Sequence, residues 1–120
     1  MEKPDVTWRV FGMYLLVLLL ILISGNASGQ IQVAQFNAGW NDANAVDWVM
    51  DLEDCKTISY TDISKNPALA TEHKIAVIPT IIIFKDDEEV ARFQADLSFK
   101  MQATKEEVQE EIDNILMSDF

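Results

Sequence analysis

Few side chains in this 120-residue sequence have types and spacing suited to chemistry. Cys55 is the only cysteine, so no disulfide can form within the chain and no cysteine-based metal site can be built. We expect it to be a buried or half-buried free thiol at the start of a strand. His73 is the only histidine, which is typical of a packing or surface residue. The acidic residues 86–89 lack the glycine and the spacing of a calcium loop. The sequence therefore predicts neither a metal site nor a cofactor.

The most informative stretch is a turn at residues 40–44, with the sequence Trp40-Asn41-Asp42-Ala43-Asn44. It follows an alternating apolar run at residues 31–36, which predicts a strand. A helix is expected over residues 43–52, since Asn41 and Asp42 are both good N-caps for its first free backbone N–H groups. The expected apolar face of that helix consists of Val46, Val49, Met50 and, less regularly, Leu52.

The middle of the chain supplies a strand, a short helix and a second strand. Residues 56–60 are rich in β-formers and alternate with polar residues, which predicts a strand. Pro67 suits the first position of a helix that extends to residue 73, with Asn66 as its cap. Residues 75–79 are expected to be extended, because a residue that precedes proline avoids helical geometry. The continuous run at residues 80–84 predicts a central strand covered on both faces.

The last third of the chain predicts a hairpin and a closing helix. A turn at residues 86–88 and a returning strand at 89–94 indicate an antiparallel hairpin with a loop longer than two residues. Residues 93–101 keep apolar character at every second position, which fits either a long strand or a strand followed by an ordered loop. Thr104 and Glu107 form a capping box. The helix that follows should end near Met117 and present Val108, Ile112, Ile115 and Leu116 on one face.

The predicted order is therefore strand, helix, strand, helix, strand, strand, helix. A parallel crossover in the first half and a hairpin in the second give a four-stranded mixed sheet. Helices should cover both of its faces, which makes the fold class α/β.

This order, together with residues 77–88, resembles the thioredoxin family. The motif is an apolar residue, proline, threonine, a buried strand, then Phe-Lys and an acidic turn, here VIPTIIIFKDDE. Residues 62–67, DISKNP, lie upstream at the family's spacing. The similarity covers most of residues 30–116 and lacks the family's extra N-terminal strand and helix, which implies a minimal thioredoxin-like fold.

The resemblance also implies that thiol chemistry is absent. It places Trp40 on the tryptophan of the family's Trp-Cys-Gly-Pro-Cys motif, Asn41 on the attacking cysteine and Asn44 on the resolving one. The family's buried carboxylate falls on Gln35 and its nearby lysine on Tyr60. Thiol exchange needs a thiolate, and a carboxamide has no proton to lose in the relevant pH range.

In the family, the proline at the place of Pro79 is cis, and the backbone of the residue before it pairs with an extended peptide. This binding mode needs no cysteine. Two interpretations of the turn stay open: a capped turn without function, or a binding edge for a protein or peptide made with Ile78 and Pro79. The candidate binding residues are Trp40, Asn41, Asp42, Ala43, Asn44, Ile78 and Pro79.

The N-terminal 29 residues have the layout of a signal peptide. An apolar run at residues 11–23 follows Lys3 and Arg9 and precedes small and polar residues. It is shorter than the roughly 17–25 residues of a spanning helix, which favours a cleaved leader over a membrane anchor. Residues 30–120 would then form one exported domain, periplasmic or extracellular, tethered to a membrane through residues 11–23 only if the leader is uncleaved.

The net charge of the chain is −11, and the leader carries two acids and two bases, so its removal leaves this value unchanged. Such a charge argues against nucleic acid or an anionic membrane surface as a partner. The first hypothesis is a redox-inactive module that binds a protein or an extended peptide. The alternative is a thiol-dependent redox protein or sensor that works through Cys55 alone.

Overall fold

The computed structural model of the chain describes residues 30–118. The segment at residues 11–23, interpreted above as a leader or anchor, lies outside this range. Within residues 30–118, none of the helices combines the length and the apolar character that crossing a membrane requires.

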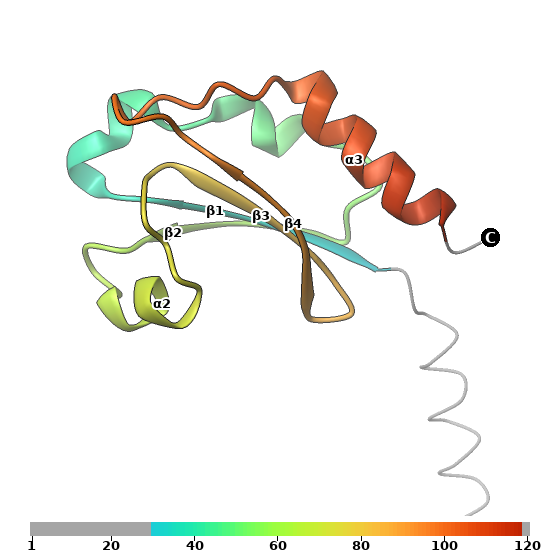
Figure 1. The fold of residues 1–120 in the computed structure, drawn as a ribbon, viewed down its shortest axis with the longest axis horizontal. Helices are drawn as coiled ribbons and strands as arrows, with labels where there is room; N and C mark the ends of the chain where they lie inside the picture. Colours follow the sequence, from blue (N-terminus) through green and yellow to red (C-terminus); the bar gives the residue numbers. More distant parts are fainter. Residues whose placement is uncertain (1–29, 119–120) are drawn as a thin grey trace, which may run out of the picture.

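The described residues form a four-stranded mixed sheet with the strand order β2-β1-β3-β4 (Figure 1). The strands are β1 (Ile31–Asn37), β2 (Thr57–Asp62), β3 (Thr80–Lys85) and β4 (Glu88–Gln94). β1 is parallel to β2 and antiparallel to β3, and β3 is antiparallel to β4. The predicted mixed sheet is confirmed, and β3 is an inner strand, as its continuous apolar run indicates.

Helices cover both faces of this sheet (Figure 1). The helix α3 (Lys105–Met117) lies on one face and α2 (Pro67–Glu72) on the other. Because side chains alternate along each strand, the core has two layers. The layer beneath α3 contains Ile31, Val33, Ile81, Ile83, Val108 and Ile112. The layer on the α2 side contains Ala34, Phe36 and Ile82, with Ile63, Ile75 and Phe84 packed against it.

The α-helix expected at residues 43–52 is not formed. Two 3₁₀-helices take its place, η1 (Gly39–Asn44) and η2 (Asp47–Asp51), separated by extended backbone at Ala45 and Val46. A 3₁₀-helix has three residues per turn, and the buried side chains here are three apart: Val46, Val49 and Leu52. Met50, which an α-helix would have placed on the same face, is 68% exposed. The three-residue spacing of these apolar side chains is typical of a 3₁₀-helix rather than of an α-helix.

The predicted helix caps have mixed outcomes. Neither Asn41 nor Asp42 caps η1, whose N-cap is Ala38 without a side-chain hydrogen bond. Asn66 is the N-cap residue of α2 but makes no side-chain cap. Thr104 caps α3 as predicted, since its Oγ1 accepts a hydrogen bond from the Glu107 N–H at 3.2 Å.

The β3–β4 hairpin has a two-residue loop, so the longer loop expected from the sequence is wrong. Asp86 and Asp87 both have positive φ, 52° and 69°. This is the geometry of a tight type I′ turn, and aspartate is among the residues that tolerate it.

Residues 95–104 form an ordered loop, which settles the alternative that the sequence left open. The Asp96 carboxylate accepts hydrogen bonds from both the N–H and the hydroxyl of Ser98. The Phe99 N–H donates to the Asp96 carbonyl at 3.0 Å, and Phe99 has a φ of 65°. A local Asx turn therefore replaces strand pairing after Gln94.

Candidate functional site

Three segments far apart in sequence meet at one end of the sheet. β1 finishes at Asn37, β3 begins at Thr80 and β4 finishes at Gln94. Thr80 pairs with Phe36 on one side and with Gln94 on the other. The turn η1, the segment that leads into β3 and the loop after β4 consequently lie at the same end of the sheet (Figure 1).

Beneath the turn lies a network of three asparagine side chains, which we call the amide network: Asn37, Asn41 and Asn44. The Asn41 Nδ2 donates to the Asn37 Oδ1 at 3.0 Å, and the Asn44 Nδ2 donates to the Asn41 Oδ1 at 2.9 Å. The Asn37 Nδ2 donates in turn to the Asn41 carbonyl at 3.2 Å. Asn37 and Asn41 are buried, at 0% and 5% exposure. Their hydrogen bonds satisfy polar groups that would otherwise be costly to bury.

The amide network also holds the loop that follows β4. The Asn41 Nδ2 donates a second hydrogen bond to the Phe99 carbonyl at 3.3 Å. The sequence predicted Asn41 as a helix N-cap and a binding residue, but its side chain lies under the turn and joins η1 to residues 96–99. Asn41 is thus a positioning residue rather than part of an accessible surface.

Gln35 fixes the junction between η1 and η2. Its Oε1 accepts from the Val46 N–H at 2.7 Å, and its Nε2 donates to the Val46 carbonyl at 3.1 Å. Gln35 is buried at 5% exposure. A neutral amide suits this position, because it offers both the acceptor and the donor that an extended Val46 requires.

The turn exposes apolar side chains as well as the Asp42 carboxylate. Trp40 is 68% exposed, and its ring meets the ring of Phe99 edge-on, with centroids 5.2 Å apart. Leu97, two residues before Phe99, is 88% exposed, and Ala43 is exposed as well. Large exposed apolar side chains that cluster are typical of interaction surfaces.

Polar contacts attach the turn to β2. The Tyr60 hydroxyl donates to the Asp42 carboxylate at 2.9 Å, and the Gly39 N–H donates to the Asp62 carboxylate at 3.2 Å. Desolvation and the hydrogen bond to Asp42 raise the pKa of Tyr60. The hydrogen bond from the Ser64 hydroxyl lowers the pKa of Asp62, which stays ionised and available to Gly39. The Asp42 side chain is therefore exposed to solvent but already accepts a hydrogen bond from Tyr60.

Ile78 and Pro79 directly precede β3, and neither presents an exposed side chain. The peptide bond between them is cis, and both side chains are buried, Ile78 at 5% exposure. The Pro79 carbonyl accepts from the Ala95 N–H at 3.0 Å. Within residues 30–118, no hydrogen bond involves the N–H or C=O of Ile78. Ile78 is thus a buried residue whose backbone polar groups make no hydrogen bond within the described residues.

No protein-family model and no curated protein sequence matches the chain. Solved structures do match. A mutant thioredoxin from Halobacterium salinarum NRC-1 superposes with a TM-score of 0.56 at 20% identity, over 75% of this chain and 79% of that one. Thioredoxin from Fasciola hepatica gives 0.52 at 22% identity, over 80% and 89%. Thioredoxin-2 of the malaria parasite gives 0.54 at 20% identity, over 71% and 82%.

The chain has a thioredoxin-like fold. At these identities the likeness concerns the fold alone, and it confirms the fold class expected from residues 77–88.

Cys55, the one thiol of this thioredoxin-like chain, lies far from the turn. The Lys56 N–H donates to the Ile31 carbonyl, which places Cys55 where β1 starts, whereas the turn lies where β1 ends. Its Sγ is 3.4 Å from the Glu53 carbonyl. Desolvation and the nearby Asp54 raise the pKa of Cys55 from 9.0 to about 11. These surroundings disfavour the thiolate that reactivity needs.

Sequence reasoning missed the roles of Asn37, Leu97 and Phe99. Asn37 follows the strand predicted at residues 31–36, and its contacts depend on the fold. A signal for the loop that carries Leu97 and Phe99 is present in the sequence, since Asp96 and Ser98 have the spacing of an Asx turn. Within residues 30–118, no group of three or more His, Cys, Asp or Glu side chains is arranged to hold a metal ion.

Proposed function

We propose that this chain is a redox-inactive thioredoxin-like module that binds an extended peptide or a segment of another protein. The observation that carries the proposal is the direct hydrogen bond between Asn44 and Asn41. These two residues occupy the places that the family resemblance assigns to the redox pair, and they make a stable polar contact there instead of a thiol pair.

The proposed binding edge consists of the Ile78 backbone and the exposed side chains of the turn. An extended peptide can pair with free N–H and C=O groups in the manner of an added strand, which supplies affinity without side-chain chemistry. Trp40 and Ala43 lie at the same end of the sheet and are exposed. Asp42 and Asn44 are their neighbours in the turn. Asn41 and Pro79 are buried beneath this surface and support it.

The proposal is tested first by an insulin-reduction assay on the full-length chain with dithiothreitol. Turnover should not exceed that of dithiothreitol alone, because no thiol stands at the turn. A thioredoxin with an intact Cys-x-x-Cys pair serves as the positive control. Clear turnover that depends on the chain would overturn the proposal.

Export belongs to the same proposal and rests on the signal-peptide layout of residues 1–29. Mass spectrometry of the protein isolated from its own host gives the test. A mature N-terminus near Gln30 supports a cleaved leader, and an intact Met1 supports a membrane tether through residues 11–23. Retention of the full chain in the cytoplasmic fraction contradicts export in either form.

The alternative, a redox protein or sensor that works through Cys55, has weaker support. A mixed disulfide with a partner would require an accessible thiolate. Cys55 is only half-buried, but its raised pKa and its distance from the turn both count against this role.

A further inference from the structure

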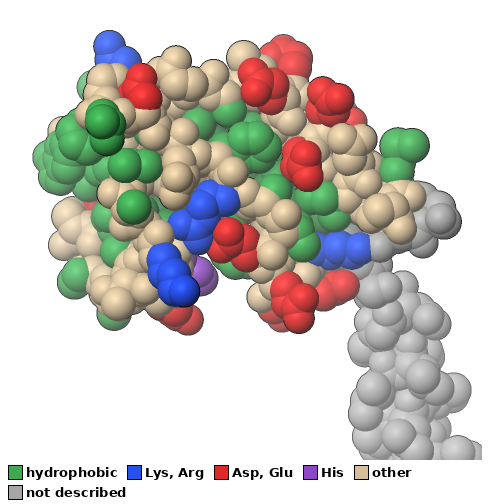
Figure 2. Space-filling view, in the orientation of Figure 1, with side chains coloured by type: hydrophobic (Ala, Val, Ile, Leu, Met, Phe, Trp, Pro, Cys, Tyr) green, Lys and Arg blue, Asp and Glu red, His purple; other side chains and the backbone are tan. Residues whose placement is uncertain are grey.

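Three apolar side chains at this end of the sheet are exposed, and we call them together the apolar platform: Trp40 from the turn, and Leu97 and Phe99 from the loop after β4. Figure 2 shows hydrophobic side chains gathered at the end of the molecule where Figure 1 places η1 and the loop after β4. Trp40 is 68%, Leu97 88% and Phe99 39% exposed. Leu97 and Phe99 come from a loop to which the sequence assigned no function.

Hydrogen bonds and one ring contact position the backbone of the loop and the rings of Trp40 and Phe99. The Asx turn of Asp96 fixes the backbone of the loop, and the Phe99 carbonyl accepts from the buried Asn41 amide. The edge-on contact between Trp40 and Phe99 orients both rings. A surface organised in advance loses little conformational entropy on binding, which favours affinity.

A groove extends from the platform. It has a volume of about 320 Å³ and is lined by residues 44–48 together with Lys100 and Met101. These residues directly follow Ala43 on one side and Phe99 on the other. The groove is therefore placed to receive a side chain next to one that packs on the platform.

Carboxylates outnumber basic side chains around the platform and the groove. The two segments that build them, residues 39–48 and 95–101, contain three carboxylates and one lysine. The carboxylates are Asp42, Asp47 and Asp96, in a chain whose net charge is −11. Figure 2 shows further acidic side chains along the side of the molecule over α3. Such a field attracts a positively charged partner and repels a second copy of this acidic chain or an anionic lipid surface.

We propose that the apolar platform docks a basic and apolar segment of another protein, in which leucine or phenylalanine side chains are flanked by lysine or arginine. This inference rests on the proposed binding function and names the chemistry of the partner. The apolar side chains pack on Trp40, Leu97 and Phe99, and the basic ones face the surrounding carboxylates.

The test measures fluorescence anisotropy of short labelled peptides titrated with the full-length chain in mild detergent. Three peptide sets share the same leucine and phenylalanine positions and carry lysine and arginine, serine and glycine, or aspartate and glutamate between them. We expect the basic set to bind at least roughly tenfold more tightly than the neutral set, and the acidic set not to bind. Added salt should weaken the basic set selectively.

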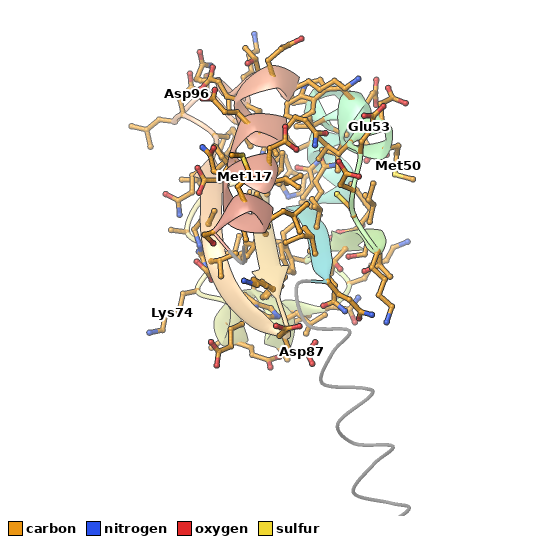
Figure 3. All side chains as sticks on the ribbon, turned by 90° about the vertical axis from the view of Figure 1, so that its right-hand side faces the viewer. Met50, Glu53, Lys74, Asp87, Asp96 and Met117 are labelled. Carbon is orange, nitrogen blue, oxygen red and sulfur yellow. The ribbon has the colours of Figure 1, made fainter. Side chains whose placement is uncertain are left out.

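Two variants test the platform itself. Leu97→Ser removes the most exposed side chain and leaves the fold intact, and Phe99→Asn removes a ring with a residue that tolerates positive φ. Each should weaken binding of the basic set roughly tenfold. Met50→Ser is the matched control, since Met50 is as exposed as Trp40 and points away from the body of the molecule (Figure 3). It should bind like the parent chain.

The remaining outcomes separate this inference from the proposed function. Peptide binding that both variants leave unchanged overturns the platform and leaves the Ile78 edge as the binding site. Equal binding of neutral or acidic peptides overturns the basic partner. Saturable binding to lipid vesicles, or self-association lost in Leu97→Ser, overturns it in favour of a membrane or a second copy. Failure of every peptide to bind overturns both proposals.

Discussion

At the end of the sheet where β1 finishes, three asparagine side chains are bonded to one another beneath an exposed aromatic pair. At the opposite end, where β1 starts, the single thiol of Cys55 lies half-buried beside Asp54. The first end is organised by many mutual contacts, whereas the thiol makes one weak contact with the Glu53 carbonyl. The contrast is between a turn ordered by mutual hydrogen bonds at one end of the sheet and, at the other, a thiol whose raised pKa disfavours the thiolate.

The largest effect is expected from Asn41→Ala, which removes the centre of the amide network. Asn37, Asn44 and the Phe99 carbonyl each lose a hydrogen-bond partner. Because unsatisfied buried groups cost about 1–3 kcal/mol each, we expect the free energy of unfolding to fall by about 3 kcal/mol. Urea denaturation followed by circular dichroism measures it.

Asn66→Ala is the control for that variant, because Asn66 is exposed and makes no side-chain cap. It should change the free energy of unfolding by less than about 0.5 kcal/mol. A loss below about 1 kcal/mol in Asn41→Ala would show that the amide network does not hold this end of the sheet.

A large effect is also expected on the rate at which Cys55 reacts with an alkylating reagent. A rise of its pKa from 9.0 to about 11 lowers the thiolate fraction about 100-fold near neutral pH. Alkylation by iodoacetamide at about pH 8 should be slower than in the chain unfolded in guanidinium chloride by about this factor. Equal rates in the two states would mean that the thiol is accessible and its pKa unperturbed. This result would support the alternative of a redox protein or sensor that works through Cys55.

A smaller, pH-dependent effect is expected from Gln35→Glu. At neutral pH the carboxylate loses the donor to the Val46 carbonyl and buries a charge, which should cost about 2 kcal/mol. Burial raises the pKa of the introduced carboxyl, so the destabilised form is the ionised one. As the pH falls, the proton restores a donor and the stability loss should shrink, vanishing below about pH 4.

Gln94→Glu makes the same chemical change at an exposed site at the end of β4. Its free energy of unfolding should follow that of the parent chain at every pH. A Gln35→Glu variant with the same flat profile would show that the Val46 contacts do not stabilise the junction between η1 and η2.

Much of the fold could be predicted from local patterns. The run at residues 80–84 marked a strand covered on both faces, and the Thr104 capping box marked the start of α3, because both signals are contained in a few neighbouring residues. The prediction of an α-helix at residues 43–52 was wrong because apolar residues three apart were assigned the α-helical period of 3.6. The hairpin loop failed because two aspartates accept the positive φ usually assigned to glycine.

The site was less accessible to sequence reasoning. Trp40 could be placed on the surface from its position in the turn, but Asn41 could not be placed beneath it. Its burial depends on the loop at residues 96–99, and Phe99, whose carbonyl it contacts, lies 58 positions further along the chain. That the Ile78 backbone makes no hydrogen bond within the described residues likewise follows from the pairing of three strands and not from its own neighbours.

The amide network has a consequence for the surroundings in which the chain can work. A turn built on a cysteine pair changes its covalent bonding with the redox potential of its compartment. Carboxamides take no part in such exchange, so the bond between Asn41 and Asn44 is the same in oxidising and reducing media. The spacing and tilt of the Trp40 and Phe99 rings above it should therefore be constant across compartments, from the site of synthesis to the final location.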